Sequence, residues 1–428
     1  MSEPGARIDA LVEPLFRRQY GRLVAGLTRI FGPARLDLVE DVVQESLLRA
    51  MRTWPFEGVP DRPERWLATV ARNLATDALR HDATAAQKQR ELATWATAAA
   101  AEAPPDRLPD EVADDTLRLI FTTCHPSLTP ETRVALTLKT LCGFGVSEVA
   151  AALLAREATV AQRLSRAKAQ LQRSEIDFVV PPPAELELRL ASVLEVLYLL
   201  FNEGYRVHRG QGLVRRDLVA EAVRLAELLC RMPETDQPQV HALLALMRFL
   251  GARLPARTDA FGELLTLSHQ DRERWDRDWL QRGFAHFARS IAGDRRTAFH
   301  VEAAIASVHA AAPTYADTDW VAVLRHYDDL VAEQDSPVVR LNRAVALAKV
   351  HGLDAGLAEL ERLDDDPKLR HYGLLPATRA QLLWSRGDPD AAAAAYRAAL
   401  ALECSEPEQQ FLQARLRRCE AGDGAPAW

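Results

Sequence analysis

Residues 39–50 read VEDVVQESLLRA, and their pattern favours a helix with one apolar face. Apolar side chains recur every three or four positions, which is the period of an α-helix. They are Val39, Val43, Leu47, Ala50 and Trp54. The opposite side carries Glu40, Asp41, Gln44, Glu45, Arg49 and Arg52. The segment therefore predicts a helix that packs through one side and keeps polar and charged side chains in solvent on the other.

A second helix is expected after a loop at residues 54–60, because Pro55 and Pro60 disfavour a continuous helix there. Its buried side is predicted at Trp66, Val70 and Leu74. Its other side presents Arg65, Thr69, Arg72, Asn73, Thr76 and Arg80. Such a row suits contacts to phosphates and base edges. A solvated charged face is the alternative interpretation of the same row.

A helix-turn-helix is predicted within residues 137–173. Ser147 is the expected cap of its short first helix. The second helix is marked by apolar residues at helical spacing, namely Val160, Leu164, Ala167 and Leu171. Between residues 156 and 173 five cations stand against one acid, a net charge of +4. A basic helix behind a short one is the geometry that places a recognition helix in the major groove of DNA, and a plain helical hairpin is the alternative.

The fold class is predicted to be all-α, because no sustained stretch alternates apolar with polar residues. Prolines at residues 104–105 and 181–183 mark two breaks. The expected organisation is a first domain at 1–82, a flexible linker at 83–113, a second domain at 114–175 and a helical extension at 184–428. The net charge is −7, but residues 1–173 carry +1 and residues 174–428 carry −8, so the acidity belongs to the extension.

Several classes of protein are excluded by composition and motifs. No apolar run approaches the roughly 20 residues that span a membrane, and the polar start at Met1–Arg7 is unlike a signal peptide. We therefore expect a cytoplasmic protein without membrane contact. The five cysteines form no CxxC pair, which argues against disulfides and against a metal site. No nucleophile elbow, phosphate loop or HExxH motif is present, so we expect no enzyme, no catalytic residue and no cofactor.

Three segments together resemble the extracytoplasmic-function (ECF) sigma factors of the sigma-70 family. Residues 39–50 look like the region 2 helix that docks on the clamp of RNA polymerase. Residues 66–77, which read WLATVARNLATD, look like the helix that melts and reads the −10 promoter element. Residues 159–168, which read TVAQRLSRAK, look like the −35 recognition helix of region 4. The order and separation of the segments match as well, and the resemblance covers residues 10–173.

The resemblance implies binding to RNA polymerase core enzyme, through its clamp helices and flap, and to promoter DNA. Core-binding residues would be Asp41, Gln44, Glu45, Leu48 and Arg49. The −10 contacts would come from Arg65, Thr69, Arg72, Asn73, Thr76 and Arg80, with a flipped base held near residues 54–62. The −35 contacts would come from Arg156, Thr159, Gln162, Arg163, Arg166 and Lys168.

The extension resembles that of one ECF subclass with a tetratricopeptide-like C-terminal domain, on residues 198–205, 270–276, 318–320 and 336–345. Independently, a period of about 35 residues relates Arg343 and Gly352 to Arg379 and Gly387, which suits stacked helical pairs at about 336–420. Asn202, Glu203, Asp271, Arg272 and Asp319 are interpreted as buried polar contacts between helices or as a peptide-binding groove.

The predicted function is that of an ECF-type sigma factor whose own extension contacts regions 2 and 4 and controls activity. A second hypothesis is a helical-repeat scaffold with a DNA-binding helix-turn-helix that regulates transcription without acting as a sigma subunit. A third is an enzyme hidden in the extension, which would need a deep pocket with convergent titratable groups.

Overall fold

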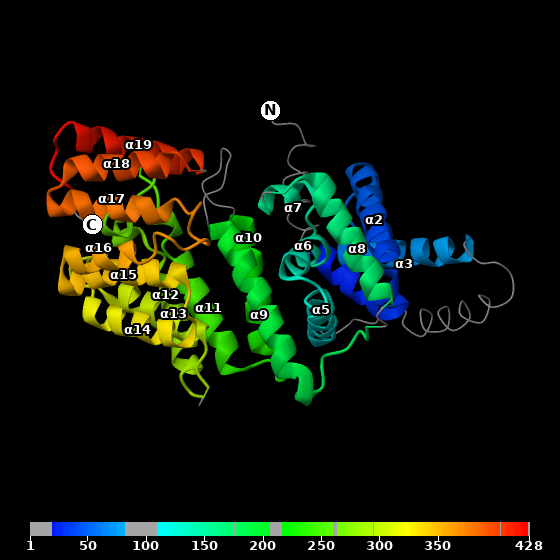
Figure 1. The fold of residues 1–428 in the computed structure, drawn as a ribbon. Coiled ribbons are helices and arrows are strands. Elements are labelled where there is room, and N and C mark those ends of the chain that lie inside the picture. The colour runs from blue at the N-terminus through cyan, green and yellow to red at the C-terminus, as the bar shows by residue number, and fades with distance from the viewer. Residues whose placement is uncertain are drawn as a thin grey trace. The chain divides into compact units, whose positions relative to one another are not determined.

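The computed structural model describes residues 19–81, 109–153, 155–173, 176–205, 216–259, 263–293, 295–402 and 404–426. The chain divides into two compact units, Met1–Leu200 and Phe201–Trp428. Each unit is built from helices, and within the described ranges the single β-type contact is an isolated bridge between Thr258 and Leu264. The prediction of an all-α fold is confirmed (Figure 1).

The first unit begins, in its described part, with a helix at residues 19–31 and the short turn η1 (Pro33–Arg35). Its further helices are α2 (Leu36–Glu57), α3 (Pro63–His81), α5 (Pro109–Thr123), α6 (Pro130–Thr140), α7 (Val146–Ala152), α8 (Glu157–Arg173) and α9 (Pro183–Tyr205), of which α9 runs on into the second unit. Prolines open several of these helices because the first turn needs no N–H from them. Residues 82–108, which hold most of the predicted linker, lie outside the described residues.

Helix α2 is longer than predicted, because it continues through Pro55 to Glu57 and leaves only residues 58–62 for the loop. The proline falls in the last turn, where a lost backbone hydrogen bond costs little further structure. Buried Trp54 anchors that turn, and its carbonyl accepts the Gly58 N–H at 3.0 Å. Gly58 has a φ of 85°, a conformation that suits glycine at a helix end.

The buried face of α3 lies one position away from the predicted one. Leu67, Ala71, Ala75 and Leu79, spaced by four, are the buried residues, whereas Trp66, Val70 and Leu74 are only half-buried. Trp66 packs edge-on against Trp54, with 5.6 Å between ring centroids. The small alanines let α3 approach its neighbours closely, which a pattern of large apolar residues does not reveal.

The helix α9 opens the predicted extension, yet its residues up to Leu200 belong to the first compact unit. Arg133 of α6, which is buried, donates a hydrogen bond to Glu195 at 3.2 Å. Arg189 donates to the carbonyl of Phe121 at 2.8 Å. The predicted boundary at residue 184 therefore falls inside the range of this unit.

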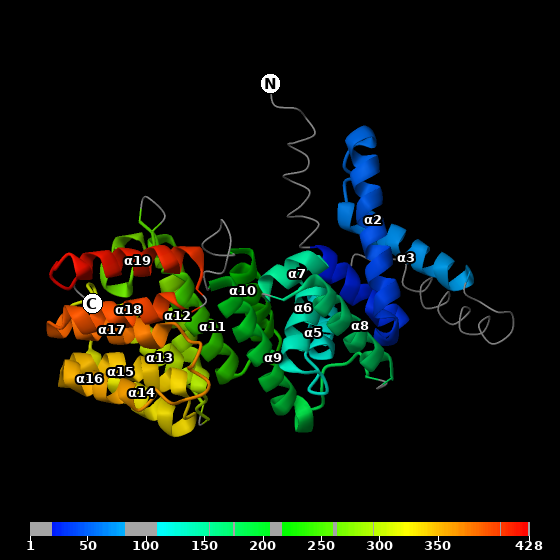
Figure 2. The same cartoon turned by 45° about the horizontal axis from the view of Figure 1, so that its top comes forward.

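The second unit contains α10 (Arg216–Arg231), α11 (Pro238–Gly251), α12 (Arg277–Ser290), α13 (Ala298–Ala311), α14 (Trp320–Glu333), α15 (Pro337–His351), α16 (Leu353–Glu361), α17 (Leu374–Arg386), α18 (Pro389–Leu400) and α19 (Glu406–Glu420). Three short turns, η2 (Leu254–Ala256), η3 (Leu267–His269) and η4 (Arg272–Arg274), connect α11 to α12. From α14 to α19 each helix packs beside the next in chain order (Figures 1 and 2).

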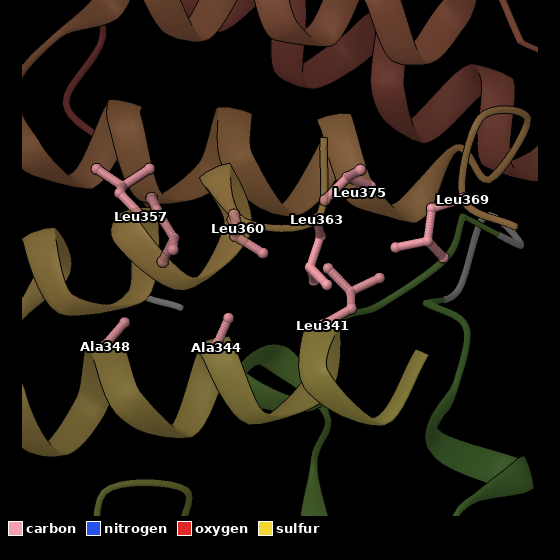
Figure 3. Packing of buried hydrophobic residues seen from close by; sticks show 9 residues of the cluster. Leu341, Ala344, Ala348, Leu357, Leu360, Leu363, Leu369 and Leu375 are labelled. Atoms are coloured by element: carbon pink, nitrogen blue, oxygen red, sulfur yellow. The ribbon is translucent and has the colours of Figure 1, made fainter. Parts of the chain in front are cut away.

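The internal repeat is visible in the backbone. Gly352 ends α15 and Gly387 ends α17, and both have a φ of 92°. Arg343 pairs with Asp328, and Arg379 pairs with Asp364, fifteen residues earlier in each case. Leucines from α15, α16 and α17 and from the turn after α16 form one buried cluster between these helices (Figure 3). The tetratricopeptide-like assignment itself stays a prediction.

The polar residues singled out in the extension connect its turns and helices. Asp271 accepts a hydrogen bond from the Glu273 N–H, and Asp319 caps α14 through the Ala322 N–H. Arg272 donates to the carbonyls of His309 and Ala312. Asp271 and Asp319 are exposed, so the prediction that they are buried is wrong. Asp271 and Asp319 bind amides of their own turn or helix, whereas Arg272 reaches across to the end of α13.

Candidate nucleic-acid interface

The helix α8 has the two faces that its sequence predicts. Val160, Leu164, Ala167 and Leu171 are buried. The other side exposes Arg156, Thr159, Gln162 and Arg166, with Arg163 half-exposed. Long side chains with hydrogen-bond donors and one hydroxyl thus share one helix face. Such groups are the ones that contact base edges and phosphates in DNA-binding helices.

The short helix α7 precedes α8 in the helix-turn-helix arrangement. It begins after Gly145, whose N–H donates to the carboxylate of Glu148 at 2.7 Å. Ser147 lies inside the first turn, so its predicted role as the cap is wrong. The reason is that Glu148, three residues after the cap, reaches back to the free amide. The turn is closed by the Ala155 N–H, which donates to the Ala150 carbonyl at 2.9 Å.

Lys168 stands apart from the other predicted −35 residues. Its ammonium lies 2.6 Å from Asp37 and 2.7 Å from Glu40, both on α2. Its side chain is 14% exposed. Burial alone would lower the pKa of Lys168, but the two carboxylates outweigh burial and raise that pKa above its ordinary value. In this structure Lys168 links region 4 to region 2 and does not belong to the exposed stripe.

Glu40 was predicted on the solvent side of α2 and is instead 2% exposed, so this part of the prediction is wrong. Besides Lys168, it accepts a hydrogen bond from the Thr140 hydroxyl at 2.8 Å. Both partners come from the second predicted domain, residues 114–175, and lie at least 100 residues away in the sequence. A carboxylate this buried requires such partners.

Close backbone packing accompanies these polar contacts. A Cβ atom on Gly21, in the helix at 19–31, would lie 2.2 Å from the carbonyl oxygen of Leu141. Only glycine fits at that distance. Arg29 of the same helix pairs with buried Asp115 of α5 at 3.3 Å. The two modules therefore share a tight, polar interface inside the first unit, which we call the region 2–region 4 interface.

The predicted −10 row lies along the solvent side of α3. Arg65, Asn73 and Arg80 are exposed, and Thr69, Arg72 and Thr76 are half-exposed. The Thr69 and Thr76 hydroxyls each donate to the carbonyl four residues earlier at 2.9 Å. Their free lone pairs and the arginine guanidinium groups remain the groups that this face offers to a ligand.

The predicted core-binding residues of α2 point to solvent. Asp41, Gln44, Leu48 and Arg49 are exposed, and half-exposed Glu45 pairs with Arg49 at 3.1 Å. Three large exposed apolar residues were not among the predicted site residues: Met51, Phe56 and Val59, on α2 and the loop after it. Phe56 is 89% exposed. Their signal in the sequence was that they break the amphipathic pattern, and apolar residues among charged ones are typical of a binding surface.

Three families match separate parts of the chain. Sigma-70 region 2 matches residues 15–84, and sigma-70 region 4 matches residues 118–171. A family of unknown function, DUF6596, matches residues 189–291, which begin within α9. No solved structure matches this chain. Two promoter-binding modules in this order define a sigma-70-type transcription initiation factor.

The relatives agree with this class. The ECF RNA polymerase sigma factor SigL of Mycobacterium tuberculosis is 31% identical over 38% of this chain and 88% of its own length. RNA polymerase sigma factor CarQ of Myxococcus xanthus is 30% identical over 32% of this chain and 74% of its own. An uncharacterized protein of Rhizobium meliloti is 36% identical over 89% of this chain and 90% of its own. The chain belongs to the ECF family of RNA polymerase sigma factors.

This membership does not favour the scaffold hypothesis, because region 2 has no role in a regulator that never binds polymerase. Among the described helices, none combines the length and the apolar character needed to cross a membrane.

The region 2–region 4 interface yields a first prediction. Lys168→Met and Glu40→Gln should each weaken it by about 1–3 kcal/mol, because each leaves the other group buried without its full partner. The double variant should reduce the free energy of opening by less than the sum of the two single reductions, with a difference of at least about 1 kcal/mol. The measurement is the free energy of opening from amide hydrogen exchange in α2 and α8.

The matched control is the exposed pair Arg80 and Asp77, 3.3 Å apart, with both side chains 64% exposed. The effects of Arg80→Met and Asp77→Asn on the free energy of opening should be additive to within about 0.5 kcal/mol. If the effects of Lys168→Met and Glu40→Gln are as additive as those of the control pair, Lys168 and Glu40 are not coupled.

Proposed function

We propose that this chain directs RNA polymerase core enzyme to promoters by binding the clamp with α2, the −10 element with α3 and the −35 element with α8. The observation that carries the proposal is the exposed cationic stripe of α8 in a segment that matches region 4, downstream of a match to region 2. A protein that works with RNA polymerase acts in the cytoplasm. Co-purification with core enzyme, followed by promoter-dependent transcription, tests the proposal directly.

Clamp binding is assigned to Asp41, Gln44, Glu45, Leu48 and Arg49. Their exposure on one side of α2 supports this assignment. Leu48 is 45% exposed and Met51 is 50% exposed, so apolar surface is available at the centre of a charged rim. Interfaces between proteins combine these two features, an apolar centre and a polar surround.

The −10 element would be melted on α3 and the loop at residues 58–62. A base that leaves the stack loses several favourable contacts, and aromatic or apolar side chains replace them. Val59 of this loop and Phe56 at the end of α2 offer exposed apolar surface. The arginines of α3 would hold the phosphates of the melted strand.

We infer that this arrangement of α2 and α8 is a closed state, and that promoter binding requires it to open. The names of the −35 and −10 elements place them about 25 base pairs apart, which is about 85 Å along B-DNA. Lys168 of α8, however, lies within 2.7 Å of two carboxylates of α2. We infer that α8 must leave α2 before both elements are bound, and that this frees Lys168 for DNA.

The second prediction concerns the clamp. Asp41→Lys together with Glu45→Lys reverses the charge on the exposed side of α2 and leaves its buried face unchanged. Binding to core enzyme should weaken at least about tenfold, because any cation of the clamp that pairs with Asp41 or Glu45 would then face a like charge. The control is Asp365→Lys, an exposed acid of the second unit. Unchanged affinity of the double variant in a pull-down would contradict the assignment.

The third prediction concerns the −35 helix. Arg163→Ala or Arg166→Ala should weaken promoter binding by about 1–3 kcal/mol. Loss of a base contact relaxes sequence preference at one position, whereas loss of a phosphate contact weakens all sequences and lowers the salt dependence. Arg173→Ala, an exposed arginine at the end of α8 outside the predicted contact set, is the control. Wild-type transcription by both variants would show that α8 is not the reading helix.

The extension would pack against regions 2 and 4 and control their relative orientation. The contacts of Arg189 and Glu195 on α9 with α5 and α6 support this proposal for its first helix. A tether holds the remaining helices at an effective concentration of about millimolar, so even a weak contact would be populated.

The fourth prediction compares two truncated chains with the full one in promoter-dependent transcription. A chain that ends at Tyr205 keeps α9, and a chain that ends at residue 175 removes it. We expect the Tyr205 chain to differ from the full protein: more transcription indicates inhibition by the extension, and less indicates a required brace. The shorter chain should also lose stability, because Arg133 stays buried without Glu195. If the Tyr205 chain transcribes like the full protein, the extension has no control function.

A further inference from the structure

Three potential metal ligands meet in the second unit. Cys230 lies near the end of α10, His241 in the first turn of α11 and His286 in α12. The Sγ atom of Cys230 is 3.5 Å from Nδ1 of His241, and the Nδ1 atoms of the two histidines are 2.8 Å apart. All three ligand atoms lie within 4.8 Å of one another.

A fourth residue orients this cluster. Asp236, in the turn between α10 and α11, accepts a hydrogen bond from Nε2 of His241 at 2.7 Å. Arg289 holds the same carboxylate at 2.9 Å. With its proton on Nε2, His241 turns the Nδ1 lone pair toward Cys230 and His286. A carboxylate behind a histidine is the arrangement that orients metal-binding imidazoles in proteins.

From this geometry we propose that Cys230, His241 and His286 bind a zinc ion. Zinc takes thiolate and imidazole ligands at about 2.3 Å and about 2.0–2.1 Å. Tetrahedral angles then place sulfur and nitrogen about 3.5 Å apart, and two nitrogens about 3.3 Å apart. The first distance is the one observed between Cys230 and His241. The two imidazoles, which stack with 5.1 Å between ring centroids, need to part by about half an ångström.

Binding needs no redox step. Zinc displaces the thiol proton of Cys230 to solvent as the S–Zn bond forms, with no oxidation or reduction. The two histidines bind through the Nδ1 lone pairs of neutral imidazoles.

The site joins three helices of the segment that matches DUF6596, residues 189–291. Three protein ligands leave one tetrahedral position, and half-exposed Cys230 and His286 allow water to occupy it. No metal site was expected from the sequence, because its five cysteines form no CxxC pair. These ligands are 11 and 45 residues apart, and only the packing of α10, α11 and α12 brings them together.

The experiment uses the full chain, stripped with a chelator and titrated with Co²⁺ as a spectroscopic substitute for zinc. We expect one equivalent of Co²⁺ to bind with a thiolate-to-cobalt charge-transfer absorption, and zinc to displace it. Cys230→Ser should abolish this absorption and His286→Asn should weaken binding strongly. Asp236→Asn should lower zinc affinity about 10- to 100-fold. Cys404→Ser and His371→Asn are the matched controls and should bind like the wild type.

Thermal unfolding separates loss of the site from loss of the fold. Zinc should raise the melting temperature of the wild type and of both controls, because it binds only the folded state. It should not raise that of a Cys230→Ser chain that retains its helical circular dichroism. If Cys230→Ser does not fold, the His286→Asn chain takes its place. Absence of the cobalt absorption in the wild type, or its survival in Cys230→Ser, would overturn the proposal.

Discussion

The buried carboxylate of Glu40 is the constraint on which the closed first unit depends. At 2% exposure it has lost most of its water, and the Thr140 hydroxyl and the Lys168 ammonium replace it. Because both partners belong to region 4, the two modules cannot separate without rehydrating a carboxylate and an ammonium together. Opening is possible because water can hydrate both groups once they separate. A new partner must then compensate for the contacts that Glu40 and Lys168 lose. DNA phosphates are suited to that, because they attract Lys168 as the carboxylates do.

The same short stretch of α2 holds the contacts to region 4 and the residues that we propose for clamp binding. Asp37 and Glu40 pair with Lys168 of region 4, whereas Asp41 and Gln44, further along the helix, face solvent. A polymerase clamp bound at Asp41 would lie directly beside the region 2–region 4 interface. Gly21 makes this interface intolerant of small shifts, because it leaves no space between the helix at 19–31 and Leu141. Tight packing of this kind favours two discrete states over gradual opening.

Periodicity predicted what depends on local packing. The apolar faces of α2 and α8 followed from spacing alone, and Gly352 and Gly387 were recognisable as equivalent helix ends before any backbone was known. Periodicity could not predict what depends on distant partners. Glu40 looked like a surface residue because Thr140 is 100 positions away. The continuation of α2 through Pro55 depends on the burial of Trp54, and the Cys230, His241 and His286 cluster depends on three helices packing together.

The net charge of the extension is a weaker guide to its contacts than it first suggests. Many of its acids are already paired within the second unit: buried Glu359 accepts from Arg340, Arg343 and Arg362, and Asp328 and Asp364 pair with the two arginines of the repeat. Paired charges attract a distant basic surface only weakly. At physiological salt, interactions between exposed charges more than about 8 Å apart are largely screened. Specific contacts such as Arg133 with Glu195, formed at short range and partly out of water, are therefore the stronger physical basis for coupling between the extension and region 4.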